Sequence, residues 1–280
     1  MRCPKCGSEN PSGNKFCGEC GYNLAARDGP APIDFRRPHS YTPKHLVEKI
    51  LTSRSAIEGE RKVVTVMFAD VTGFTPMSEK LDPEDVHQIM NGCFRILMDE
   101  VHKCEGTVNE FRGDGVMALF GAPIAHEDHA QRACYAALAV QQGLLPYSEK
   151  LKREFGIDFK VRIGLNSGPV VVGAIGDDLR MDYTAQGDTA NLAARMETSA
   201  EPGTVLVSEQ TYRLAKEFFE FEPLGKIQVK GKEQPVAAYR LRDKAYRARA
   251  RSERAIYSDM VGRDQELARL ELQVLKAVNG

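Results

Sequence analysis

Two aspartates occur where a folded sheet could bring them together at one edge. Asp70 follows an apolar, β-branched run over 63–69, and a turn that contains Gly73 comes next. Asp114 lies in the tight turn Gly113–Gly115, between two further strand-like segments. Carboxylates beside backbone that can approach a ligand closely are typical of a metal ion that holds phosphate. Either acid alone is equally compatible with an ordinary cap or turn residue, so a metal site requires that the fold unite them.

Four cysteines near the N-terminus form a second constellation, in two C-x-x-C-G segments with ten residues between the pairs. They are Cys3, Cys6, Cys17 and Cys20. Each such turn aims two thiolates at one point, and two turns complete a tetrahedral site for one zinc ion. Because protein fills all four positions, the zinc is predicted to be structural and to supply most of the folding energy of so short a segment. A redox or disulfide pair is the alternative.

The bulk composition excludes several other classes of function. The 280 residues carry a formal net charge of −1 with 28% charged residues, so no basic excess points to nucleic acid. No apolar run reaches the length of a membrane span, and the N-terminus lacks the pattern of a signal peptide. The seven cysteines, an odd number, favour metal ligation over disulfides in a reducing compartment. These properties predict a soluble, cytoplasmic protein.

The segments around the two aspartates show the periodicities of helices and strands. Apolar residues recur at three- and four-residue spacing over 83–104, which predicts a helix, and a second helix is predicted over 127–155. Strands are predicted over 106–111 and 116–120, on either side of a tight turn at 112–115. The turn that holds the second aspartate is therefore expected to be the tip of a hairpin.

Two more strands are predicted after the second helix, over 159–166 and 170–175, with Ser167-Gly168-Pro169 interrupting them. Strand, helix, hairpin, helix and strand is the order of the split βαβ, ferredoxin-like α+β fold. In that topology the first strand lies beside the strand that returns after Asp114, so Asp70 and Asp114 meet at one edge of the sheet. Two converging carboxylates are what a two-magnesium phosphoryl-transfer site requires.

Three longer segments carry a family resemblance. They are Phe68–Thr75 (FADVTGFT), Phe111–Gly121 (FRGDGVMALFG) and Gly187–Glu197 (GDTANLAARME). Together they resemble the motifs of the class III adenylate/guanylate cyclases, and the similarity covers about residues 61–241. The resemblance implies an enzyme that converts ATP or GTP to the 3′,5′-cyclic monophosphate and pyrophosphate, by in-line attack of the 3′-hydroxyl on the α-phosphorus. The alternative is a regulatory nucleotide-binding domain with weak or no turnover.

The resemblance also implies roles for individual residues. Asp70 and Asp114, with the carbonyl of Val71, match the residues that bind two Mg²⁺ or Mn²⁺ ions. Asn191 and Arg195 match the catalytic pair that orients the ribose and stabilises charge on the α-phosphate; four residues apart, they reach the same side of a helix. The expected phosphate-binding residues are Thr72, Gly73, Phe74, Thr75, Arg162 and Lys230. The last two are also compatible with surface charges beside strands.

Two positions match the residues that recognise the base in this family, and the residue types found there favour different bases. Glu110 stands where adenylate cyclases usually carry lysine and guanylate cyclases carry glutamate, since a carboxylate accepts from guanine N1–H and the 2-amino group. Thr184 is common at the second position in bacterial adenylate cyclases, whereas guanylate cyclases more often have cysteine. The chemistry of Glu110 favours GTP, and the predominance of adenylate cyclases among bacterial relatives favours ATP. By a narrow margin, ATP is expected.

In this family the site forms between two head-to-tail domains. One domain contributes the metal-binding acids, and the other contributes the base-reading, asparagine and arginine residues. This chain contains both sets but only one cyclase domain. A homodimer with two equivalent sites is therefore expected.

These observations divide the chain into four parts. They are a zinc ribbon at 1–22, a linker with a connecting helix at 23–60, the cyclase catalytic domain at 61–242, and a connector with the start of a further region at 243–280. A solvated spacer is the alternative to the connecting helix. Val261–Leu270 resembles the opening of large bacterial regulatory ATPase domains. The chain is therefore expected to be a fragment of a longer bacterial protein with regulatory domains.

Overall fold

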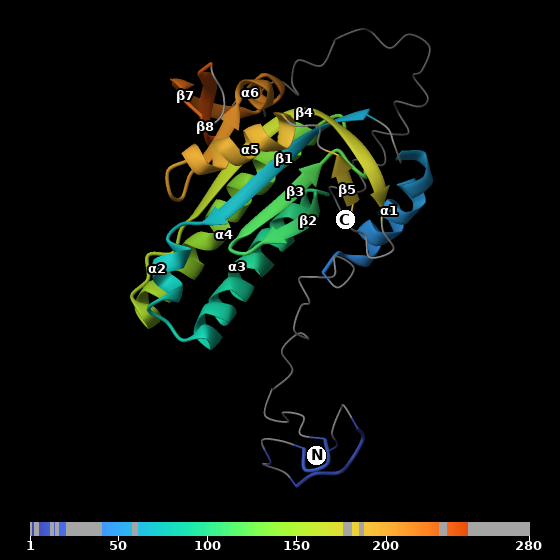
Figure 1. The fold of residues 1–280 in the computed structure, drawn as a ribbon, viewed down its shortest axis with the longest axis vertical. Helices are drawn as coiled ribbons and strands as arrows, with labels where there is room; N and C mark the ends of the chain where they lie inside the picture. The colour runs from blue at the N-terminus through green and yellow to red at the C-terminus, as the bar shows by residue number, and fades with distance from the viewer. Residues whose placement is uncertain are drawn as a thin grey trace, which may run out of the picture.

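A mixed sheet of eight strands organises the part of the chain that the structure describes (Figure 1). The structure is a computed structural model, and it describes residues 2, 6–11, 14, 17–20, 41–57, 61–175, 181–184, 188–229 and 234–245. The strands are β1 (Arg61–Val71), β2 (Thr107–Arg112), β3 (Gly115–Phe120), β4 (Val161–Ile175), β5 (Met181–Thr184), β6 (Val205–Ser208), β7 (Phe219–Ile227) and β8 (Val236–Lys244). The helices are α1 (Lys44–Ile57), α2 (Phe74–Ser78), α3 (Pro83–Lys103), α4 (His129–Phe155), α5 (Asp188–Ser199) and α6 (Glu209–Ala215).

The strand order confirms the ferredoxin-like arrangement. In the order β2-β3-β1-β4-β6-β8-β7, β1 is antiparallel to both of its neighbours, β3 and β4, and β5 pairs with β4 outside this path. The register sets Asp70 of β1 opposite Gly115 on one side and opposite Arg162 on the other. Gly115 directly follows Asp114, so the two aspartates meet at the same end of β1, as the topology predicts.

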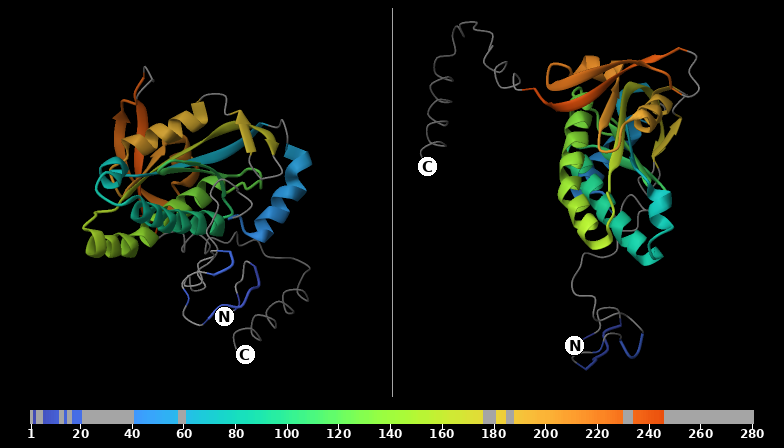
Figure 2. Two further views of the ribbon diagram at one scale, coloured as in Figure 1. Left: turned by 60° about the horizontal axis from the view of Figure 1, so that its bottom comes forward. Right: turned by 90° about the vertical axis from the view of Figure 1, so that its left-hand side faces the viewer.

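Alternation along β1 gives the sheet two apolar faces. Met67 and Ala69 are buried in the core that α3 and α4 cover. Val64 and Val66 are buried in the core beneath α5. In the right-hand view of Figure 2, α4 and α5 lie on opposite sides of the strands. Because side chains two residues apart share a face of a strand, Asp70 lies on the same face as Val66, toward α5.

Strand β4 corrects one prediction. Ser167-Gly168-Pro169 does not separate two strands, because β4 continues unbroken from Val161 to Ile175. The Pro169 carbonyl accepts a hydrogen bond from the Thr189 hydroxyl of α5 at 2.9 Å, so the polar backbone group of this residue has a partner in the neighbouring helix. A proline at a position whose N–H would not pair with the neighbouring strand removes no ladder hydrogen bond.

The burial of side chains in α1 and at the start of β1 tests two expectations from the sequence. Helix α1 is no solvated spacer, since Leu46 and Ile50 are each only 1% exposed. Leu51 follows Ile50 by one residue and thus lies off this buried face, and it is 45% exposed. Val63 is likewise 58% exposed, so the buried part of β1 begins at Val64. Residues 21–40, which include the first part of the predicted linker (23–60), and residues 246–280 lie outside the described residues.

Helix α5 approaches β4 closely at one glycine. A Cβ on Gly164 would lie 2.1 Å from the Glu197 backbone nitrogen and 2.4 Å from the Ala193 carbonyl oxygen. We expect Gly164→Ala to lower the free energy of unfolding by about 1–3 kcal/mol, because the helix or the strand must shift. Urea unfolding followed by circular dichroism measures this change.

A matched control for this prediction is Gly143→Ala in helix α4. There the added Cβ would meet only the Ile96 side chain, at 3.0 Å, and alanine favours a helix. The control variant is expected to unfold at the same urea concentration as the wild type or above it. Equal stability of the Gly164→Ala protein and the wild type would contradict the close approach.

Candidate active site

The carboxyl groups of Asp70 and Asp114 converge at the end of β1. The Val71 amide donates a hydrogen bond to the Asp114 carbonyl oxygen at 3.3 Å, which ties the hairpin turn to the central strand. Burial and the neighbouring charge of Asp70 raise the pKa of the Asp114 carboxyl above its ordinary value. Two acids that repel one another in a partly buried place form a site that gains from binding a cation.

Arg162 compensates this negative charge. Its Nη2 donates to Asp70 Oδ2 at 2.7 Å, and its Nε lies 3.2 Å from Glu197 Oε1 of α5. The side chains of Arg162 and Asp70 are each 25% exposed, and that of Glu197 is 11% exposed. The predicted phosphate contact Arg162 is therefore held between two carboxylates, one of which is a predicted metal ligand.

Glu197 is a site residue to which the sequence analysis assigned no role. Burial and the charges of Asp70 and Asp114 raise the pKa of its carboxyl to about 6, although Arg162 acts in the opposite direction. The residue closes the third family segment, but nothing in that segment shows that a helix would pack its C-terminal end against Arg162. Only the approach of α5 to β4 brings these groups together.

This raised pKa predicts a pH dependence of stability in the protein without added Mg²⁺. Since the pKa of Glu197 in the fold is about 6 against an ordinary value of 4.5, the folded protein binds more protons than the unfolded chain between these values. The free energy of unfolding should therefore fall as the pH rises through this window, by on the order of 1–2 kcal/mol from this residue.

Glu197→Gln should flatten that dependence, because the glutamine does not titrate. Urea unfolding of both proteins at pH 4.5, 5.3, 6 and 7 measures it. Asp114, whose pKa is also raised, contributes a remaining slope of the same sign in both proteins. Identical slopes for the wild type and Glu197→Gln would show that the Glu197 carboxyl is not perturbed.

The predicted phosphate loop 72–75 forms the entry to helix α2. Gly73 adopts a left-handed backbone conformation, with φ of 73°, directly before the first helical residue, Phe74. Glycine adopts this conformation without the steric cost that other residues meet. The Thr72 amide donates to the Lys160 carbonyl at 2.9 Å. In this arrangement the Thr72 amide is occupied, so the amides that follow it are the better candidates for phosphate donors.

Helix α5 carries the predicted catalytic pair. Asn191 is exposed and Arg195 is half-buried. Within the described part of the chain, neither side chain makes a hydrogen bond or ion pair with Asp70 or Asp114. Of the other predicted site residues, Lys230 and the side chain of Thr184 lie outside the described residues, although the Thr184 backbone belongs to β5.

The register arranges the α5-facing side of the sheet in two rows. One row crosses β2, β3, β1 and β4 through Arg112, Gly115, Asp70 and Arg162. The neighbouring row contains Glu110, Met117, Phe68 and Gly164. The predicted base-reading Glu110 is exposed and thus lies one row from the predicted metal ligand Asp70.

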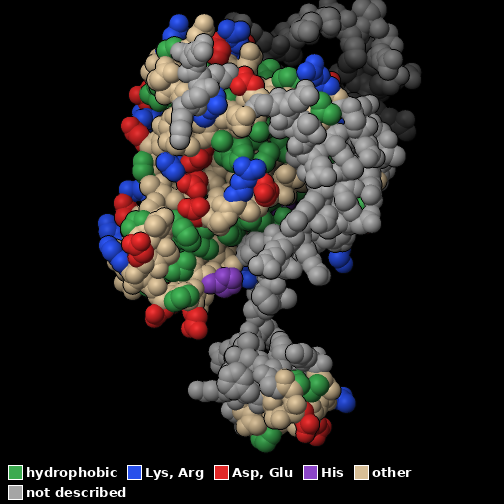
Figure 3. All heavy atoms as spheres, in the orientation of Figure 1, with side chains coloured by type: hydrophobic (Ala, Val, Ile, Leu, Met, Phe, Trp, Pro, Cys, Tyr) green, Lys and Arg blue, Asp and Glu red, His purple; other side chains and the backbone are tan. Residues whose placement is uncertain are grey.

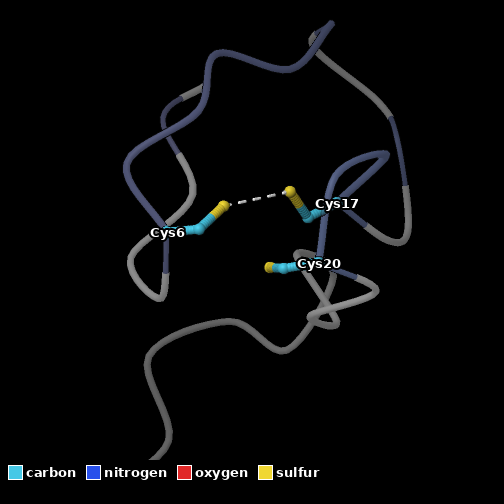
Figure 4. Close-up of side chains that lie close together, drawn as sticks. All are labelled: Cys6, Cys17 and Cys20. Carbon is cyan, nitrogen blue, oxygen red and sulfur yellow. Dashed lines mark hydrogen bonds between the residues drawn. The ribbon is translucent and has the colours of Figure 1, made fainter.

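Three of the four predicted zinc ligands come together (Figure 4). The Sγ atoms of Cys6, Cys17 and Cys20 all lie within 4.8 Å of one another, and the Sγ atoms of Cys6 and Cys17 are 3.6 Å apart. Hydrogen bonds, chiefly from the Cys20 amide and also from the Asn10 side chain, lower the pKa of the Cys17 thiol to about 5. Converging sulfur atoms, one stabilised as thiolate, fit a structural zinc ion. Cys3 lies outside the described residues.

On the face that Figure 3 shows, the described residues carry charges of both signs. Acidic and basic side chains are interspersed there, with apolar side chains between them. None of the helices among the described residues is long and apolar enough to cross a membrane.

Comparisons with known proteins agree with this geometry. The family described as "Adenylate and Guanylate cyclase catalytic domain" matches residues 58–243, and a zinc-ribbon domain family matches residues 2–24. Adenylate cyclase 1 of Rhizobium meliloti is 36% identical over 203 residues, which are 71% of this chain and 30% of that protein. Guanylate cyclase soluble subunit beta-2 of Rattus norvegicus is 30% identical over 200 residues, or 69% of this chain and 28% of that protein. This chain thus spans about a third of the length of these relatives.

Solved structures show the same similarity. The adenylyl cyclase CyaB from P. aeruginosa has a TM-score of 0.61 at 34% identity, covering 67% of this chain and 97% of that one. The guanylate cyclase domain of RhGC from Catenaria anguillulae, in complex with GTP, has a TM-score of 0.58 at 32% identity, covering 66% of this chain and all of that one. The chain therefore belongs to the class III adenylate and guanylate cyclase catalytic domains, with a zinc-ribbon domain at its N-terminus.

Proposed function

We propose that the protein is a nucleotide cyclase that converts ATP or GTP to the 3′,5′-cyclic monophosphate and pyrophosphate. The observation that carries the proposal is the convergence of Asp70 and Asp114 at one end of β1, with Arg162 bound to Asp70. Their carboxylates suit two Mg²⁺ or Mn²⁺ ions, which would activate the 3′-hydroxyl and stabilise the leaving pyrophosphate when bound. Membership of the family supports this type of reaction, and Asp70 and Asp114 are the carboxylates that the reaction requires.

In the proposed mechanism the side chains of the protein position the substrate and neutralise its charge, and none of them forms a covalent bond with it. Asp70, Asp114 and the Val71 carbonyl would hold the metal ions. Arg162, which donates to Asp70 in this structure, would contact the phosphates when metal ions occupy the site, because a guanidinium and a dication repel one another. Arg195 would stabilise the charge that develops on the α-phosphate, and Asn191 would orient the ribose.

The proposed active unit is a homodimer. Among the described residues, Asn191 and Arg195 make no hydrogen bond or ion pair with the aspartates of their own chain. A second copy in head-to-tail orientation would present them to the metal site, and symmetry would then create two equivalent sites. The boundaries that we propose are a zinc ribbon at 1–22, a linker and α1 at 23–60, and the catalytic domain at 61–242.

One experiment separates this proposal from a regulatory nucleotide-binding domain without turnover. Purified protein is incubated with ATP or GTP and with Mg²⁺ or Mn²⁺, and cAMP and cGMP are quantified by mass spectrometry. Product above the level of an Asp70→Ala control supports the cyclase. Nucleotide binding without product under all four conditions would instead support the regulatory domain.

A further inference from the structure

A second charged residue stands beside the predicted base-reading carboxylate. Arg112 donates through Nε to Glu110 Oε2 at 2.8 Å. The two residues are two positions apart in β2, so their side chains share the face of the sheet that also carries Asp70. The side chains of Arg112 and Glu110 are 58% and 49% exposed. In an isolated chain such a pair is weak, but a nucleotide that covers it would strengthen it by excluding water.

The guanidinium of Arg112 also has a defined direction. It lies over the Phe68 ring, 5.5 Å from the ring centroid. Phe68 belongs to β1, so Arg112 must reach across β3 to contact it. The residue that β3 places opposite Arg112 is Gly115, which has no side chain to obstruct this path. An ion pair and a cation–π contact thus hold Arg112 between the row of Glu110 and the row of Asp70.

The ion pair changes what Glu110 can recognise. A free carboxylate offers acceptors only, so it matches the N1–H and 2-amino donors of guanine and faces the N1 lone pair of adenine unfavourably. With Oε2 accepting from Arg112, Glu110 presents its other oxygen, Oε1, as the open acceptor for a donor such as the 6-amino group of adenine. The remaining N–H groups of Arg112 can donate to an acceptor beside it, such as adenine N1.

We propose that Arg112 is a specificity-determining residue that pairs with Glu110 and thereby makes the base pocket accept ATP. This inference rests on the proposed cyclase function and adds the choice of base to it. The carboxylate at position 110, taken alone, favours GTP; the dyad of Glu110 and Arg112 presents an acceptor next to donors, as the adenine edge requires. Removing the arginine returns the pocket to a free carboxylate.

The test compares kcat/KM for ATP and for GTP in the wild type, Arg112→Gln, Glu110→Gln and the double variant. Arg112→Gln is expected to lower the ATP-to-GTP ratio of kcat/KM by about tenfold, which is typical of one lost base contact. In the Glu110→Gln background the same change should lower the ratio less than it does in the wild type, since no carboxylate remains to be neutralised and only the contact of Arg112 with adenine N1 is lost. An unchanged ratio in Arg112→Gln, or a shift toward ATP, would overturn the inference.

A matched control is Arg213→Gln. Arg213 forms an ion pair of the same kind, with Nε 2.7 Å from Glu209 Oε1, on the surface of α6. This variant should keep the wild-type ratio. If Arg112→Gln forms no product, displacement of a fluorescent nucleotide by ATP and by GTP in Ca²⁺ gives the ratio from binding instead. A wild type that forms no product from either nucleotide would contradict the proposed function, whereas product with an unchanged ratio contradicts only the role of Arg112.

Discussion

Asp70→Asn is expected to lower the rate of cyclic nucleotide formation by about three orders of magnitude, because the contribution of a catalytic metal ion is several kcal/mol. The asparagine keeps the shape of the side chain and loses the charge that the metal ions and Arg162 share. Arg162 Nη2 lies 2.7 Å from Asp70 Oδ2, so the same change also frees a guanidinium to repel the ions. Initial rates at saturating ATP or GTP, measured over a series of Mn²⁺ concentrations, give the size of the loss.

The control for this experiment is Asp243→Asn, which removes an exposed carboxylate from β8. It should leave the rate unchanged. Melting temperatures of both variants, compared with the wild type, show whether the fold is retained. A rate for Asp70→Asn above about a tenth of the wild type, in a folded protein, would mean that Asp70 does not hold a catalytic metal ion.

Mixing two inactive variants is expected to restore activity if the sites are shared between two chains. In an equimolar mixture of Asp70→Ala and Arg195→Ala proteins, half of the dimers combine one chain of each kind. Each mixed dimer has one site that carries both substitutions and one site that carries neither. The mixture should therefore reach about a quarter of the wild-type rate, when exchange of chains is complete. Rates over a range of mixing ratios measure the effect.

A second mixture provides the control. Asp70→Ala and Asp114→Ala remove residues from the same half of the proposed site, so no dimer of these chains contains an intact site. This mixture should stay inactive at every ratio. Rescue in both mixtures would indicate contamination, and rescue in neither would contradict a site shared between chains.

The sequence predicted the strongly periodic parts of the fold well. The helix expected over 83–104 is α3 (Pro83–Lys103), because its apolar spacing and Pro83 at the first turn act locally. The pairing that unites Asp70 and Asp114 followed from topology, since the order of the elements restricts where β3 can lie. The break expected at Pro169 was wrong, because β4 continues through this residue and the Thr189 hydroxyl of α5 satisfies its carbonyl.

The contacts within the site could not be predicted in the same way. Glu197 binds Arg162 only because α5 and β4 approach at Gly164. Arg112 can reach diagonally across β3 to Phe68 because the register places Gly115, which has no side chain, opposite Arg112. Both contacts join residues of different elements, and neither leaves a periodic signal in the sequence. The resemblance to the cyclases identifies the residues that are expected to act on the substrate, but it gives no information about the side chains that contact them.

The close approach at Gly164 has a consequence for the whole assembly. Helix α5 presents Asn191 near its N-terminal end, whereas Glu197 near its other end contacts Arg162 beside the Asp70 of the same chain. In the proposed homodimer this helix therefore serves both active sites, because Asn191 and Arg195 act at one of them and Glu197 lies beside the other. Because the helix backbone rests directly on β4, it cannot move at one end without disturbing the other. Nucleotide bound at one site should therefore alter the affinity of the second, and the dimer should bind its substrate cooperatively.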